Sequence, residues 1–198
     1  MKRGDVDTRS PNLVVRFNEQ RFSESEIRAL LDIVRPYTEV HASKEYTFSI
    51  DLPTILTIVI VLWSSYFAKG FFTKVGEKLG EEVGSDAVQG YRKLKEAVAG
   101  LLRRKAGASP CILRFELVSE RKLEIHGKVE SSSEKELEQA FDTLESLVVM
   151  AEDDAREVRE TTGEAVVEVH YHYQPNPRSW IMTYGLTSNG RIIRLAEG

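Results

Sequence analysis

Cysteine is almost absent from this chain, since Cys111 is the only one in 198 residues. A single thiol excludes an intramolecular disulfide framework and any zinc site built from several cysteines. Cys111 belongs to a run of alternating apolar residues and has no activating base beside it in the sequence. We therefore expect it to be a small core side chain rather than a nucleophile.

Familiar catalytic and nucleotide-binding motifs are missing as well. The sequence contains no G-x-S-x-G, no P-loop, no G-x-G-x-x-G and no H-E-x-x-H motif. We therefore expect a protein that is not an enzyme, and we predict no catalytic residue and no cofactor.

A large excess of one charge is also lacking, because 27 Lys and Arg residues stand against 31 Asp and Glu residues and give a formal net charge of −4. This balance provides no general attraction to nucleic acid or anionic lipid. The hydrophobic fraction of 41% is that of a globular protein. The N-terminal residues 1–12 are charged and unlike a secretory signal, so we expect a cytoplasmic location, with membrane association as the alternative.

A β-α-β unit is predicted at the N-terminal end. The apolar run 13–17 suits a strand. Ser23, followed three residues later by Glu26, forms a capping box that begins a helix, and Pro36 ends that helix. Alternation of apolar and polar residues over 45–50 predicts a second strand.

From Leu52 to Ala68 the chain has 17 residues without a charge. Nearly every position is apolar, so periodicity does not separate a helix from a buried strand, and the many β-branched residues suit a strand. We favour a helix because apolar residues continue at helical spacing as far as Val83. Such a helix is either part of the protein core or in contact with a membrane. Its 17 residues would be about 26 Å long, slightly short of the roughly 30 Å hydrocarbon core of a bilayer.

Three glycines spaced four residues apart follow this run and lie on one face of the predicted helix. Each glycine inside a helix costs about 0.8–1 kcal/mol relative to alanine, so the spacing suggests a contact that needs a smooth surface. That contact is with the neighbouring helix or with a second copy of the chain; alternatively, the glycines mark the end of a shorter helix. The candidate residues for self-association or membrane contact are Trp63, Phe67, Gly76, Gly80 and Gly84.

Charge is segregated along the chain, because a predicted helix ending near residue 105 is basic and the segment 130–160 is acidic. The simplest explanation is two solvated helix faces. The alternatives are a patch for phosphate groups, or complementary surfaces in a homo-oligomer. Few aromatic residues accompany the cations and no nucleic-acid motif is present, so nucleic acid is not an expected partner. The basic patch consists of Arg92, Lys93, Lys95, Arg103, Arg104 and Lys105.

The C-terminal half is expected to be an antiparallel sheet of order β-β-α-β-β-β, covered by one amphipathic helix. Alternation over 111–117 and 123–129 predicts a hairpin. Ser133 and Glu136 predict a second capping box at the start of the helix. The remaining strands are predicted over 165–173, 180–186 and 192–195.

Glu168, His170 and His172 alternate along one of these strands, so their side chains share a face at spacings of about 6.6 Å. Two imidazoles and a carboxylate suit a divalent metal ion with an open position. The simpler explanation is that a half-buried strand carries polar residues on its wet face. For a further ligand the sequence suggests only His126, on the predicted hairpin.

The sequence thus predicts an α+β protein made of two parts, 1–106 and 107–198, packed as one compact unit. The expected function is a non-enzymatic interaction, in which helix 52–84 mediates self-association or contacts a membrane surface or spans it once. A homo-oligomer is the expected assembly. The competing hypothesis is a soluble ligand- or nucleic-acid-binding module in which this helix is only core, and a metal enzyme is the third.

Overall fold

The computed structural model describes residues 12–17, 22–36, 39–44, 54–60, 85–105, 111–119 and 121–194. The strands are β1 (Asn12–Phe17), β2 (Glu39–Lys44), β3 (Thr54–Ile60), β4 (Cys111–Val118), β5 (Glu124–Ser131), β6 (Val166–Gln174), β7 (Ser179–Thr187) and β8 (Ile192–Ile193). The helices are α1 (Glu24–Val34), α3 (Ser85–Lys105), α4 (Glu134–Asp142) and α5 (Leu144–Thr162).

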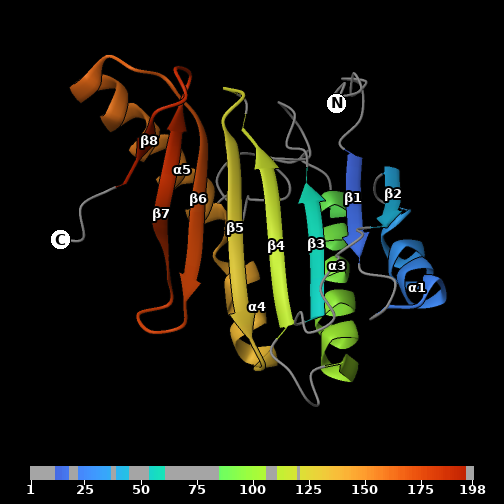
Figure 1. Ribbon diagram of the computed structural model, residues 1–198. Coiled ribbons are helices and arrows are strands. Elements are labelled where there is room, and N and C mark those ends of the chain that lie inside the picture. The colour runs from blue at the N-terminus through green and yellow to red at the C-terminus, as the bar shows by residue number, and fades with distance from the viewer. Residues whose placement is uncertain are drawn as a thin grey trace.

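These strands form one eight-stranded sheet in the order β2-β1-β3-β4-β5-β6-β7-β8 (Figure 1). The helices of the described part of the chain lie on one side of it, and the protein has the predicted α+β fold. Three neighbouring pairs are parallel, namely β1 with β2, β3 with β4, and β5 with β6. Parallel neighbours need a crossover connection, and each of these three contains a described helix. We call the sheet face opposite the helices the open face.

Helix α1 begins with the predicted capping box. The Glu26 N–H donates to Ser23 Oγ at 3.3 Å, and Ser23 N–H donates to Glu26 Oε2 at 2.8 Å. Phe22 and Ile27 are both buried beside this cap, in the positions of a hydrophobic staple. The helix ends at Val34, just before Pro36, as predicted.

Residues 54–60 form strand β3, so the apolar helix predicted for this run is wrong here. β3 lies between β1 and β4 and pairs with both, so that Ile58 is opposite Val15 on one side and Phe115 on the other. The β-branched residues of this run favour extended backbone, and the strand is hydrogen-bonded on both edges. Of the predicted helical hairpin, the structure describes only α3, and residues 61–84 lie outside the described part of the chain.

The C-terminal sheet is mixed, not antiparallel as predicted. β4 and β5 form the predicted antiparallel hairpin, and β6 pairs antiparallel with β7, as β7 does with β8. β5 and β6 are parallel, however. The helical segment between them is long enough to return the chain to the same end of the sheet, so the next strand runs in the same direction.

The single covering helix predicted for this half is two helices, α4 and α5, which meet at Thr143. The indole Nε1 of Trp180 donates to the carbonyl oxygen of Thr143 at 3.2 Å and to its Oγ1 at 3.0 Å. Thr143 Oγ1 in turn donates to the carbonyl of Ala140 at 3.1 Å. A side chain from β7 thus holds the junction in place.

The second predicted capping box, at Ser133 and Glu136, is not formed. Ser133 is the N-cap residue of α4, but its side chain makes no capping hydrogen bond. Glu136 instead accepts a hydrogen bond from Ser131 Oγ, which itself accepts one from Ser133 N–H at 2.8 Å. Because Ser131 is the last residue of β5, the strand end supplies the cap.

The core lies between the sheet and the helices. Phe115 packs edge to face against Phe141, with ring centroids 4.9 Å apart, and against Trp180 at 6.2 Å. Cys111 is fully buried in the same core, and burial raises the pKa of its thiol. Cys111 is therefore the core side chain that the sequence predicts.

Two predicted strands differ in extent from those observed. The strand that follows α1 is Glu39–Lys44, and the predicted strand 45–50 lies outside the described residues. The last strand, β8, is Ile192–Ile193 and is shorter than predicted. The two predicted parts of the chain meet where β3 and β4 pair along the whole of β3, and the boundary between them stays a prediction.

Candidate functional site

Polar side chains on the open face form three adjacent rows across the strands. They arise because alternate residues of a strand point to opposite faces, and residues that pair across strands stand side by side. The rows are an acidic row (Glu124, Glu168), a histidine row (Glu116, His126, His170, Tyr184) and a basic row (Arg114, Lys128, His172), each composed of residues that pair across neighbouring strands.

Three rings of the histidine row are stacked. His126 and His170 lie with ring centroids 4.4 Å apart and planes 7° from parallel. His170 and Tyr184 follow at 4.1 Å and 17°. The stack joins β5, β6 and β7, and it follows from the register, because each ring is the direct partner of the next.

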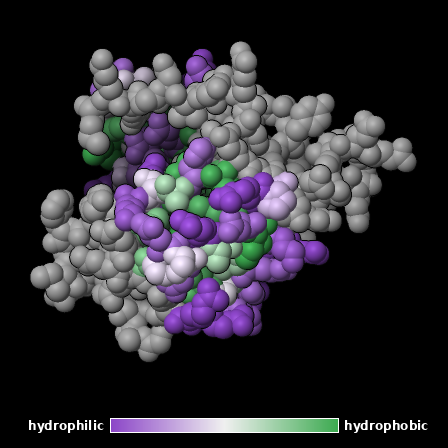
Figure 2. Space-filling model, turned by 90° about the vertical axis from the view of Figure 1, so that its right-hand side faces the viewer, coloured by the Kyte–Doolittle hydropathy of each residue, from purple (hydrophilic) through white to green (hydrophobic). Residues whose placement is uncertain are grey.

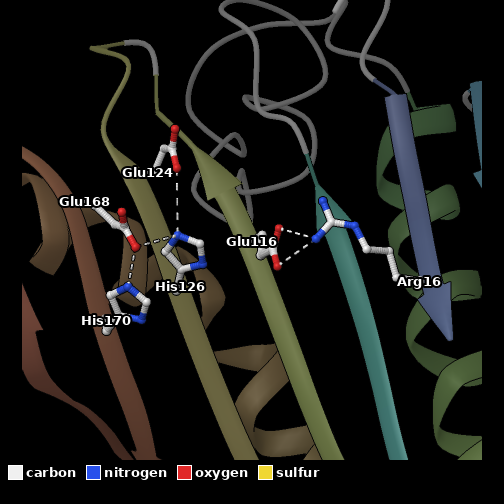
Figure 3. A network of polar contacts seen from close by, with 6 residues as sticks. All are labelled: Arg16, Glu116, Glu124, His126, Glu168 and His170. Carbon is white, nitrogen blue, oxygen red and sulfur yellow. Dashed lines mark hydrogen bonds and ion pairs between the residues drawn. The ribbon is translucent and has the colours of Figure 1, made fainter. Parts of the chain in front are cut away.

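Glu168 lies against both histidines (Figure 3). His170 Nε2 donates to Glu168 Oε1 at 2.6 Å, and the same oxygen is 3.5 Å from His126 Nε2. Glu124 Oε2 is 4.0 Å from that nitrogen. The Nε2 atom of His126 is buried and has no hydrogen-bond partner in the described part of the chain. Buried polar atoms are normally paired, so this nitrogen indicates a missing partner.

The pKa of His126 lies below its usual value. The main cause is burial, which disfavours the charged imidazolium, and the neighbouring His170 acts in the same direction. Glu116, Glu168 and Glu124 oppose the shift without cancelling it. His126 is therefore neutral near pH 7, with a lone pair available on the ring.

We expect the protein to lose stability as the pH falls below about 6.5, where an unfolded histidine begins to bind a proton. Folded His126 has a lower pKa, so the unfolded state binds more protons in this range and the free energy of unfolding decreases with decreasing pH. Urea unfolding at pH 7.5 and 5.5, in EDTA, measures this loss. The loss should be smaller in His126→Gln than in the wild type; an equal loss contradicts the assignment.

The structure changes the metal-ligand set that the sequence predicts. His126, Glu168 and His170 each offer a ligand atom, and these atoms lie within 4.8 Å of one another. His172, predicted as the third ligand, is not in this cluster and stands opposite Lys128 instead. The parallel pairing of β5 with β6 brings His126 beside His170, and the sequence holds no local signal for that pairing.

An ion pair that the sequence does not predict reaches across a strand. Arg16 Nη1 of β1 lies 3.1 and 3.0 Å from the two carboxylate oxygens of Glu116 on β4, with β3 between them (Figure 3). The pair neutralises Glu116 at one end of the histidine row. The two residues are far apart in the sequence, so no spacing rule finds them.

A hollow of about 440 Å³ opens over the histidine row and the basic row on β4 to β7. Its lining includes His126 and His170 of the histidine row, together with Arg114 and Lys128 of the basic row. Arg114 is exposed and makes no ion pair within the described residues. Lys128 pairs with Glu130 on its own strand at 3.0 Å. Within the described residues, the hollow therefore has one cation in its lining, Arg114, that no carboxylate neutralises.

A second hollow, of about 340 Å³, lies between α1 and β2. Figure 2 views this side of the molecule, where hydrophilic side chains surround a smaller hydrophobic area. Two of the cations that line it are already paired, Lys44 with Glu24 at 2.8 Å and Arg35 with Asp32 at 2.6 Å. Arg28 also lines this second hollow and makes no ion pair within the described residues, so ion pairing does not separate the two hollows. The hollow on the open face is distinguished by the stacked rings of His170 and Tyr184 in its lining.

The predicted basic patch lies on α3 and is largely neutralised by the same chain. Two of the carboxylates concerned belong to α4, so the basic helix complements the acidic one within the molecule, and the hydrogen bond from Arg103 lowers the pKa of Glu134. Arg104 is exposed. The ion pairs are Arg92 and Lys93 with Glu96, Lys95 with Asp142, and Arg103 with Glu134.

The residues predicted for self-association or membrane contact lie outside the described part of the chain, so this contact and the expected homo-oligomer stay predictions. Among the described residues, no helix is both long and apolar enough to cross a bilayer. The residues concerned are Trp63, Phe67, Gly76, Gly80 and Gly84.

No protein-family model, no curated protein and no solved structure matches this chain. The functional interpretation of the open face therefore rests on its own geometry.

Proposed function

We propose that this protein is a non-enzymatic binding module that holds a small organic anion in the hollow of its open face. Arg114 carries the proposal, because it lines a concave site, is exposed and has no ion-pair partner within the described residues. An arginine side chain matches carboxylate and phosphate groups with paired hydrogen bonds. This is the ligand-binding alternative that the sequence offers.

Lys128 adds a second positive charge in the same row. Its ion pair with Glu130 is exposed on both sides, at 42% and 41% of the side-chain surface. Exposed pairs of this kind contribute only about 0–1 kcal/mol, so an incoming anion displaces Glu130 at little cost. The two cations together favour a ligand with two negative charges, such as a phosphate monoester.

The opposite wall supports an aromatic part of the ligand. Tyr184 is 36% exposed and borders the hollow, so its ring offers surface for stacking. The volume of about 440 Å³ lies in the range of known small-molecule sites. A nucleoside monophosphate has both parts, a ring and a dianion.

Isothermal titration of the full chain in EDTA, with adenosine monophosphate and with inorganic phosphate, tests the proposal. We expect the nucleotide to bind more tightly than phosphate alone. Arg114→Gln should weaken nucleotide binding about 10- to 100-fold, because hydrogen bonds to charged groups contribute roughly 1.5–3 kcal/mol.

Arg159→Gln is the matched control. Arg159 is exposed on α5, on the helix-covered side of the sheet, and its substitution changes the net charge equally. This variant should bind the nucleotide as the wild type does. Equal weakening by both substitutions, or no binding of either anion at millimolar concentration, overturns the proposal.

A further inference from the structure

We propose that His126, His170 and Glu168 form a binding site for one divalent transition-metal ion. Their ligand atoms lie within 4.8 Å of one another, and Glu168 Oε1 is 3.5 Å from His126 Nε2 and 2.6 Å from His170 Nε2. Donors held at about 2.0–2.2 Å from one ion lie roughly 3 Å apart, so small side-chain rotations bring these three to that spacing.

The buried nitrogen of His126 is the second observation that indicates a ligand. His126 Nε2 has no hydrogen-bond partner in the described part of the chain. An unpaired buried polar atom is unfavourable, and a metal bond satisfies it. The site thus has a donor nitrogen that no hydrogen bond within the described residues occupies.

The charges around the two histidines suit a cation of charge +2. Glu168 and Glu124 both approach His126 Nε2 with carboxylate oxygens, at 3.5 and 4.0 Å. The third carboxylate, Glu116, is already neutralised by Arg16. Glu168, whose Oε1 lies closest to both histidines, therefore supplies negative charge opposite a divalent ion.

Binding requires a local rearrangement that the stack permits. In-plane lone pairs of parallel rings do not converge, so one imidazole must turn. The ring of His126 lies at the end of the stack, whereas His170 lies between His126 and Tyr184. His126 therefore turns while the His170–Tyr184 contact stays. The neutral His170 ring takes the tautomer with its proton on Nδ1, which gives Nε2 a lone pair for the ion, and the hydrogen bond to Glu168 is replaced by bonds to the ion.

The donor set selects the class of ion. Imidazole nitrogens suit zinc, copper, nickel and iron, whereas magnesium and calcium prefer oxygen ligands. Three protein ligands leave a position for water or another ligand, as in open metal sites. This inference does not rest on anion binding, because Arg114 takes no part in the metal site.

The test is titration of the EDTA-treated full chain with Zn²⁺ in a phosphate-free buffer, followed by calorimetry, with Co²⁺ absorption as a second readout. We expect one saturable site. His126→Gln and His170→Gln should each weaken Zn²⁺ binding at least about tenfold, since even outer-shell partners of a metal contribute 10- to 100-fold. Glu168→Gln should also weaken Zn²⁺ binding at least about tenfold. Because glutamine keeps the shape of the glutamate side chain, this variant tests the metal site even if a histidine variant does not fold.

The other two histidines of the chain supply the controls. His172 lies on the same strand and face as His170, and His41 lies on β2. The variants His172→Gln and His41→Gln should bind Zn²⁺ with a dissociation constant within about twofold of the wild type, a change in binding free energy well under 1 kcal/mol. Magnesium should give no saturable binding. The proposal is overturned if the wild type has no saturable zinc site, if His172→Gln weakens binding as much as His126→Gln, or if His126→Gln leaves it unchanged.

Discussion

Trp180→Ala is expected to lower the free energy of unfolding by about 3–5 kcal/mol, the cost of deleting a large buried aromatic side chain. Trp180 is only 2% exposed. Its ring packs against Phe115 at 6.2 Å and Tyr173 at 5.2 Å between centroids, and its indole donates to Thr143 at the junction of α4 and α5. The substitution removes both the packing and the hydrogen bond, so the whole interface between helices and sheet loosens.

Urea unfolding of Trp180→Ala beside Trp180→Phe measures this effect. Phenylalanine keeps much of the ring packing and loses the hydrogen bond to Thr143, so its loss should be smaller, on the order of 1–3 kcal/mol. If the alanine variant is as stable as the phenylalanine variant, Trp180 does not hold the core in this way.

Gly127→Val is expected to destabilise the protein by about 1–3 kcal/mol or more through overpacking. A Cβ atom at Gly127 would lie 2.9 Å from Leu147 Cδ2 and 3.0 Å from Trp180 Cζ3, and both neighbours are buried. Interiors are close-packed, so the side chains or the strand must shift. Because Gly127 lies between His126 and Lys128, a shift of β5 should also weaken anion binding.

A double-mutant cycle checks the proposed cause. Gly127→Ala should destabilise the protein less in a Leu147→Ala background, because the larger deletion makes room for the added methyl group. Strictly additive effects would show that contact with Leu147 is not the source of the loss. Circular dichroism of all four proteins of the cycle, recorded beside the unfolding curves, checks that each one is folded.

Local signals predicted several elements correctly. The capping box of Ser23 and Glu26 and the stop at Pro36 involve residues within a few positions of each other, so the helix bounds follow from the sequence. Alternation over β4 and β5 predicted a hairpin with one wet face for the same reason.

The predicted elements that proved wrong are those whose structure is decided by residues distant in the sequence. The apolar run at residues 54–60 carries no periodicity, and it becomes a strand because β1 and β4 flank it. The junction of α4 and α5 at Thr143 accepts a hydrogen bond from Trp180, 37 residues away in sequence. Neither contact leaves a trace in the local pattern.

For the candidate site, the sequence determined that Glu168 and His170 share a strand face, because side chains alternate with a period of two. Only the tertiary structure decided that His126, and not His172, completes the cluster, because the parallel register of β5 and β6 aligns His126 with His170. The separation of basic and acidic helices likewise depends partly on the sequence and partly on the tertiary structure. Its presence is a property of the sequence, whereas its pairing across α3 and α4 depends on how the helices pack, since electrostatic contact requires proximity in space.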